Sequence, residues 1–205
     1  MHETLEPSSS SPPEPAALDA ADVRAACDGD RGAFDRLVLR HQQAVLNTAF
    51  YLLSDYQDAL EVAQETFLKA YRGLAGFRSE ASFRTWILRI TTNSARSLRS
   101  RMRAKKRSAN LVSLSAEADD RPALEVADRR ETDPAALLQR KEVKEALEEA
   151  IASLDPQYRE IVVLRDISGE SYEAISESLG VPLGTVKSKI HRARLQLREA
   201  MTPLL

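Results

Sequence analysis

The segment SYEAISESLGVPLGTVKSKIHRARLQL, residues 171–197, constrains the fold most, because apolar residues recur in it at helical spacing on both sides of a glycine. Ile175 and Leu179 belong to a first short helix, predicted over about 171–178. Gly180 follows, where the end of a helix needs a residue that tolerates positive φ. The apolar positions of a second helix then share one face: Val186, Ile190, Ala193 and Leu197. The pattern predicts a helix-turn-helix.

Three residues of the turn fit this prediction. Ser176 is small at the point where the two helices must cross closely. Pro182 suits the lead into the second helix, and Thr185 is a candidate cap for it.

The polar face of the second helix predicts DNA binding. Residues 180–198 contain five lysines and arginines and no acid. A helix in the major groove needs donors for phosphates and a few side chains that reach base edges. The alternative is a solvated basic face on an ordinary helix, but the turn and the absence of acids favour DNA. The face shows Lys187, Ser188, Lys189, His191, Arg192 and Arg194, and we interpret His191 as a DNA contact rather than a metal ligand.

The rest of the chain predicts an all-α fold of two small helical domains joined by a flexible linker. Helical periodicity dominates, no run of strongly alternating residues occurs, and there are only 7 glycines. A stretch rich in Ser, Pro and Glu comes first, and a stretch with seven acids and three arginines separates the helical parts. The predicted division is a disordered tail at 1–20, a first domain at 21–107, a linker at 108–134 and a second domain at 135–205.

The first domain has a nucleic-acid signal of its own. Between Arg78 and Arg107 there are ten basic residues and one acid, Glu80. Aromatic residues lie at the start of this segment: Phe77, Phe83 and Trp86. Basic groups hold a phosphate backbone while rings stack on bases, so the combination suits single-stranded DNA. Core packing accounts for Trp86 at least as well, whereas Phe77 lies in a predicted loop where packing explains it less easily.

Several classes of protein are disfavoured. A single cysteine excludes an internal disulfide, and one cysteine with three scattered histidines disfavours a zinc site. The longest aliphatic run, IVVL at 161–164, is far too short to cross a bilayer, and no secretory signal is present. No nucleotide-binding or nucleophile motif occurs. We therefore expect a cytoplasmic protein without membrane insertion, cofactor or metal, which is not an enzyme.

Two segments together are similar to a known family. QDALEVAQETFLKAYRGLAGFRSEASFRTWILRITTNSA, residues 57–95, and LDPQYREIVVLRDISGESYEAISESLGVPLGTVKSKIHRARLQL, residues 154–197, resemble bacterial extracytoplasmic-function (ECF) sigma factors. These are small sigma-70 type initiation factors that keep only the second and fourth conserved domains. The resemblance implies that the chain binds core RNA polymerase, reads the minus-35 element as duplex, and captures the minus-10 element as it opens by flipping a base into a pocket.

The resemblance also implies roles for individual residues. At the core polymerase interface it places Asp58, Glu61, Gln64 and Glu65. Around the melted minus-10 strand it places Phe77, Arg78 and Ser79 in the flipped-base loop, with Trp86, Asn93, Arg96, Arg99 and Arg103 along the strand. On the minus-35 element it places Thr185, Lys187, Ser188, Lys189, His191 and Arg192. Two mild departures are Glu61, where the family often has Asp, and Ser176, where it commonly has Ala.

A regulator and two competing functions complete the predictions. Family members are commonly held inactive by an anti-sigma factor between the two domains, and the acidic linker is compatible with such a partner. The first competing function is a two-domain helix-turn-helix regulator that is not a polymerase subunit. The second is a small helical nuclease or nucleotidyl-transfer enzyme, for which Asp55, Asp58, Glu61 and Glu65 share a helical face.

Overall fold

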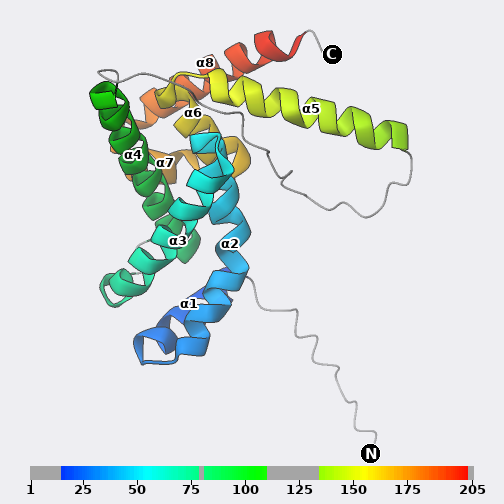
Figure 1. The fold of residues 1–205 in the computed structure, drawn as a ribbon. Helices are drawn as coiled ribbons and strands as arrows, with labels where there is room; N and C mark the ends of the chain where they lie inside the picture. Colours follow the sequence, from blue (N-terminus) through cyan, green and yellow to red (C-terminus); the bar gives the residue numbers. More distant parts are fainter. Residues whose placement is uncertain (1–14, 79–80, 110–133, 203–205) are drawn as a thin grey trace, which may run out of the picture.

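The computed structural model describes residues 15–78, 81–109 and 134–202, and every regular element in these ranges is helical (Figure 1). The elements are α1 (Pro15–Cys27), α2 (Arg31–Leu53), α3 (Tyr56–Gly73), the short η1 (Leu74–Gly76), α4 (Phe83–Ala109), α5 (Pro134–Ser153), α6 (Pro156–Val162), the π-helical turn η2 (Val163–Ile167), α7 (Tyr172–Leu179) and α8 (Leu183–Met201). The predicted all-α fold is confirmed. Most of the predicted linker lies outside the described residues.

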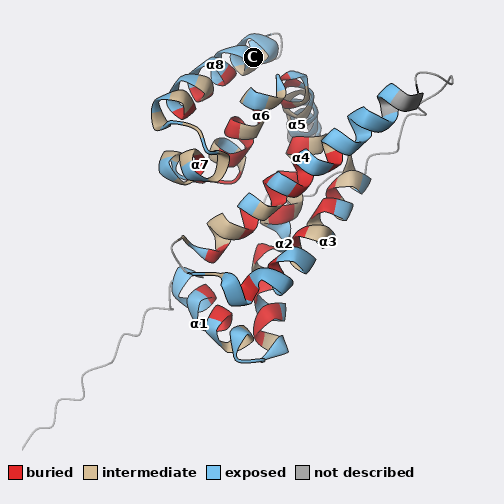
Figure 2. Ribbon diagram, turned by 90° about the vertical axis from the view of Figure 1, so that its left-hand side faces the viewer, coloured by how far each residue is buried: buried red, intermediate tan, exposed pale blue. Residues whose placement is uncertain are grey.

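Helices α1 to α4 form the first helical unit, around a core to which each of them contributes. Leu37, Val45 and Ile87 are fully buried there, and Phe83 is almost fully buried. The helical spacing of these apolar residues turns one side of α2 and of α4 toward the core, and Figure 2 shows the buried positions on these inner faces. No helix in the described part of the chain is long and apolar enough to span a membrane.

The first helix starts earlier than the sequence predicted. Disorder was expected up to residue 20, but α1 begins at Pro15, so that boundary is wrong for 15–20. Of the predicted tail, residues 1–14 lie outside the described residues. The physical reason is a set of ion pairs to α2: Asp19 accepts from Arg40 Nε at 2.9 Å, and Asp22 accepts from Arg36 Nε at 2.8 Å. These pairs hold a helix that has little apolar periodicity of its own.

The ends of the helices follow local chemistry. Asp55 caps α3 by accepting from the Asp58 N–H at 2.7 Å. Ser54 closes α2 in the left-handed conformation, with φ 62°. In the second unit, Ser171 caps α7 by accepting from the Ala174 N–H at 3.0 Å.

Helices α5 to α8 form the second unit, and its core is the predicted helix-turn-helix. Ile175 of α7 packs with Val186 and Ile190 of α8, over Ile161 and Leu164. Gly180 lies between α7 and α8 with φ 65°, as the turn requires. Ser176 Oγ donates to the Val181 carbonyl at 2.6 Å, which adds a hydrogen bond across the turn.

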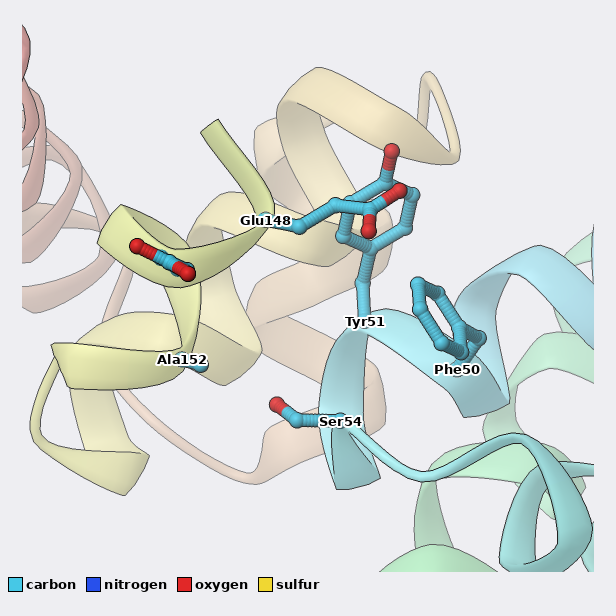
Figure 3. Close-up of a pocket in the computed structure, with 6 residues that line it drawn as sticks. Phe50, Tyr51, Ser54, Glu148 and Ala152 are labelled. Atoms are coloured by element: carbon cyan, nitrogen blue, oxygen red, sulfur yellow. The ribbon is translucent and has the colours of Figure 1, made fainter. Parts of the chain in front are cut away.

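The two units pack against each other along a seam. One continuous apolar cluster combines Phe50 of α2 and Leu98 of α4 with Ile151 of α5 and Val163 of η2. In Figure 1, α2 lies beside the elements of both units. Packing leaves a small notch where the end of α2 faces α5, lined by Phe50, Tyr51, Ser54, Glu148, Glu149 and Ala152 (Figure 3). Burial raises the pKa of Tyr51, and the nearby Glu148 carboxylate acts in the same direction.

Candidate nucleic-acid interface

The polar, cationic face of α8, which we call its reading face after the sequence prediction, is separated from its buried face. Val186 and Ala193 are fully buried and Ile190 is 2% exposed, so these three anchor the helix to the second unit. In Figure 2, buried positions recur along α8 between exposed ones. The opposite face carries Lys187, Ser188, His191 and Arg192 in exposed positions, with Thr185 and Lys189 half-buried beside them. All six predicted minus-35 residues therefore lie near or on one side of the helix.

Two details of α8 differ from the expectation. Thr185 does not cap the helix with its side chain: Pro182 is the N-cap, and its carbonyl accepts from the Thr185 N–H at 2.8 Å. Arg194 is turned toward its own domain, where its guanidinium donates to both oxygens of Asp166 at 3.0 and 2.5 Å. These hydrogen bonds raise the pKa of Arg194. The ion pair also joins α8 to η2.

The loop before α4 is built on an aromatic cluster. The Phe77 ring lies 5.0 Å from the Trp86 ring and 6.2 Å from the Phe83 ring, measured between centroids. Phe77 is half-buried and packs on the core of the first unit, so the interpretation that packing explains it poorly is wrong. Phe83 forms the base of the cluster, while Phe77 and Trp86 remain partly exposed. Arg78 is exposed, and Ser79 lies outside the described residues.

The candidate strand-binding residues of α4 are not equally free. Asn93 and Arg103 are exposed, and Arg99 is half-buried. Arg96 is exposed but hydrogen-bonded to a carboxylate. Arg96 donates from Nε and Nη2 to the two oxygens of Glu160 on α6, at 2.5 and 2.6 Å. These hydrogen bonds raise the pKa of Arg96, whereas burial, with the charge of Arg103, lowers the pKa of Arg99. The structure thus places one predicted phosphate contact in a contact between the two units.

The acidic face of α3 carries the predicted polymerase contacts. Glu61 and Gln64 are exposed, and Asp58 and Glu65 are half-buried. Glu65 pairs with Lys69 at 2.8 Å, and Arg101 of α4 lies 3.8 Å from Glu61. Burial raises the pKa of Asp58, and the charges of Asp55 and Glu61 add to the effect.

This face does not form a metal site. The Asp55 carboxylate is used as a helix cap, and Glu65 faces cations on α3 and α4. Within the described ranges, no group of three or more His, Cys, Asp or Glu side chains is arranged to hold a metal ion. The carboxylates that suggested a nuclease in the sequence analysis are instead used, in Asp55 and Glu65, for a helix cap and for ion pairs.

Sequence reasoning missed two residues of the α3 surface. Leu68 is 57% exposed and Tyr71 is 51% exposed, although both are large and apolar in character. They follow Glu61, Gln64 and Glu65 at helical spacing, so the acidic face continues into an apolar patch. An apolar residue within the polar stripe of an amphipathic helix was the signal that would have identified them.

Comparisons with known proteins agree with this geometry. The family model described as Sigma-70 region 2 matches residues 37–107, and the model described as Sigma-70, region 4 matches residues 144–197. The RNA polymerase sigma-H factor of Pseudomonas aeruginosa is 36% identical over 177 residues, which are 86% of this chain and 90% of that protein. The ECF RNA polymerase sigma-E factor of Escherichia coli K12 is 33% identical over 180 residues, 86% of this chain and 91% of that protein.

Solved structures show the same fold. The structure of CnrH in complex with the cytosolic domain of CnrY superposes with a TM-score of 0.64 at 26% identity, covering 91% of this chain and 98% of that chain. The sigma factor RpoE of Bartonella quintana, solved with the anti-sigma factor NepR, superposes with a TM-score of 0.65 at 23% identity, covering 82% of this chain and 96% of that chain. The chain belongs to the sigma-70 family of RNA polymerase sigma factors, in its extracytoplasmic-function group.

Proposed function

We propose that this chain directs core RNA polymerase to promoters by reading the minus-35 element as duplex and holding the minus-10 element as it opens. The observation that carries the proposal is the exposed cationic face of α8, set on a fully buried anchor of Val186 and Ala193. A helix fixed in this way enters the major groove as a rigid body. In this proposal Lys187 contacts a phosphate, and Ser188, His191 and Arg192 contact base edges.

In this proposal the first unit binds the minus-10 element. Partly exposed rings of Phe77 and Trp86 offer stacking surfaces at the start of α4, and Arg78 is exposed beside them. Asn93, Arg99 and Arg103 continue along α4 and supply polar and cationic contacts to a single strand. Ser79 remains a proposed member of the flipped-base loop on the family resemblance alone.

The energetics make this a task for a complex with polymerase. Flipping or unstacking a base costs a few kcal/mol, and stacking on an aromatic ring returns about 1–3 kcal/mol per base. The chain alone therefore gains too little to melt several base pairs. We propose that the acidic face of α3, with Asp58, Glu61, Gln64 and Glu65, docks on core polymerase together with the Leu68 and Tyr71 patch.

Binding energy, rather than a catalytic step, accounts for this activity, so we assign the chain no reaction of its own. Its place of action is the cytoplasm, where polymerase and DNA meet. We further propose an anti-sigma partner, as the family resemblance implies. A pull-down from the native cell that recovers no stable inhibitory chain would contradict that partner.

Run-off transcription tests the function directly. Purified core polymerase, with and without this protein, is incubated with a pool of genomic DNA fragments. Discrete transcripts that depend on the protein are expected, and alignment of their start sites gives both promoter elements. Binding of DNA without any dependent transcript would instead favour the helix-turn-helix regulator and remove the α3 assignments.

A further inference from the structure

The seam between the two units is closed by polar contacts as well as by its apolar cluster. Thr48 Oγ1 on α2 lies 2.8 Å from Ser168 Oγ just after η2, and both residues are buried. The Ser168 carbonyl accepts from Arg84 Nη2 on α4 at 2.7 Å. Buried hydrogen bonds between residues so distant in the chain fix one relative position of the units.

A buried arginine strengthens the same seam. Arg159 of α6 is 7% exposed, and its Nη1 donates to the Leu52 carbonyl at the end of α2, at 3.3 Å. Its Nη2 donates to the carbonyls of Ala152 and Leu154 in its own unit. Burial, together with the charge of Arg99, lowers the pKa of Arg159 to about 10.

Glu160 forms an ion pair across the seam with Arg96, one of the predicted phosphate contacts of α4. It is the residue next to Arg159, and its carboxylate receives the two parallel hydrogen bonds from Arg96 at 2.5 and 2.6 Å. The Glu160 side chain is 15% exposed and the Arg96 side chain 44% exposed, so the pair lies at the rim of the seam. A guanidinium makes this two-pronged contact with carboxylate and with phosphate alike.

The closed arrangement also conflicts with reading two promoter elements at once. Elements centred near minus 35 and minus 10 lie about 25 base pairs apart, which is about 85 Å along straight B-form DNA. The units that contact one another at the seam form a body with a radius of gyration of roughly 15 Å for this number of residues. The seam must therefore open before α4 and α8 reach their elements together.

We propose that the seam is an intramolecular latch, in which Glu160 occupies Arg96 in place of a DNA phosphate until the two units separate. The inference rests on the proposed function, because phosphate competes with Glu160 only if α4 receives the melted strand. It assigns to Glu160 a role that differs from packing: it lowers the affinity of the free chain for single-stranded DNA. Polymerase and promoter contacts offset the loss of the seam when the chain opens.

A disulfide across the seam tests whether opening is needed. Thr48→Cys and Ser168→Cys are combined in a Cys27→Ser background, which removes the chain's single native cysteine. The 2.8 Å between the native hydroxyl oxygens places the new sulfurs within reach of a bond. After oxidation with diamide, run-off transcription with core polymerase should be lost, and dithiothreitol should restore it. Equal transcription by the oxidised and reduced forms would overturn the latch.

The charge contact is tested without polymerase. Glu160→Gln should raise the affinity of the free protein for an oligothymidylate of about 20 nucleotides by about tenfold at low salt, because a charged hydrogen-bonding partner of Arg96 is removed. Glu142→Gln makes the same charge change at an exposed site on α5 and should have little effect. The gain should disappear when Arg96→Ala is added. An equal gain in both glutamine variants, or a gain that survives Arg96→Ala, would overturn the role of Glu160.

The two arms separate failure of the latch from failure of the proposed function. If wild-type protein and the reduced cysteine variant direct transcription, the sigma activity stands whatever the oxidised form does. If wild-type protein directs none, the proposed function fails, and the oligothymidylate comparison still decides whether Glu160 occupies Arg96.

Discussion

The two helices that we propose contact DNA, α8 and α4, differ in how their cationic faces are set in the molecule. On α8, Lys187 and Arg192 are exposed and the opposite face is buried, so anchoring and reading use different residues. On α4, Arg96 is bound to Glu160 and Arg99 is half-buried, so the same face contributes to the seam. The cationic face of α8 is therefore free to bind DNA as it stands, whereas in our proposal the face of α4 must first release Glu160.

The largest expected effect tests the anchor of α8. Ile190→Ala removes a fully buried side chain, so the free energy of unfolding should fall by about 3 kcal/mol. Leu195→Ala, at a position 40% exposed on the same helix, should change it by less than about 0.5 kcal/mol. Urea denaturation followed by circular dichroism measures both. Similar losses in the two variants would show that α8 does not have separate anchoring and reading faces.

The next effect tests the reading face. Arg192→Ala should weaken binding to the minus-35 duplex by about 2 kcal/mol and relax the preference for one base there, provided that the guanidinium contacts a base edge. Arg24→Ala makes the same charge change at an exposed site on α1 and should leave base preference intact. Fluorescence anisotropy with base-substituted duplexes measures the preference. An unchanged preference in Arg192→Ala would remove its role in reading.

A smaller effect tests the aromatic cluster of the other unit. Phe77→Ala should leave duplex binding near normal and reduce open-complex formation about tenfold, because one stacking surface is lost. Phe77→Leu retains apolar packing against Trp86 and Phe83 but cannot stack, so it separates the two roles of the ring. Permanganate reactivity of melted thymines reports opening. Wild-type reactivity in both variants would leave Phe77 with packing alone.

The smallest effect concerns the support beneath that cluster. His41 Nε2 lies 2.8 Å from Asp19 Oδ2, and the His41 ring contacts Phe83 at 5.3 Å between centroids. Burial lowers the pKa of His41, with Arg84 and Arg40 acting in the same direction and Asp19 opposing them. Below about pH 6.5 the unfolded chain then binds more protons than the folded one, so stability falls on acidification.

Comparison with His41→Gln isolates this contribution. Between pH 7 and 5 the wild type should lose up to about 1 kcal/mol more in free energy of unfolding than the variant does. Urea denaturation at each pH measures the difference. Parallel losses in the two proteins would show that His41 does not titrate differently in the folded state.

The sequence predicted α8 well because every signal there is local. The repeat of Val186, Ile190 and Ala193 and the position of Gly180 depend on residues within a few turns. The Asp55 cap is local in the same way, because its hydrogen bond reaches only three residues along the chain.

The parts that sequence reasoning missed depend on distant partners. Glu160 lies 64 residues from Arg96, and no periodicity connects them. The start of α1 depends on Asp19 and Asp22 meeting arginines on α2, and Phe77 depends on a ring cluster closed by tertiary packing. The sequence shows the charged and aromatic residues at these positions, but only the fold determines which partners they contact.

The apolar cluster at the seam has a consequence for the solubility of the open chain. Separating the units would present Phe50, Leu98, Ile151 and Val163 to water as two facing patches. Exposed patches of this kind are sites of association and aggregation unless another surface covers them. While the units stay together, each one covers the other's patch, so the separation proposed above would require a second surface to cover them.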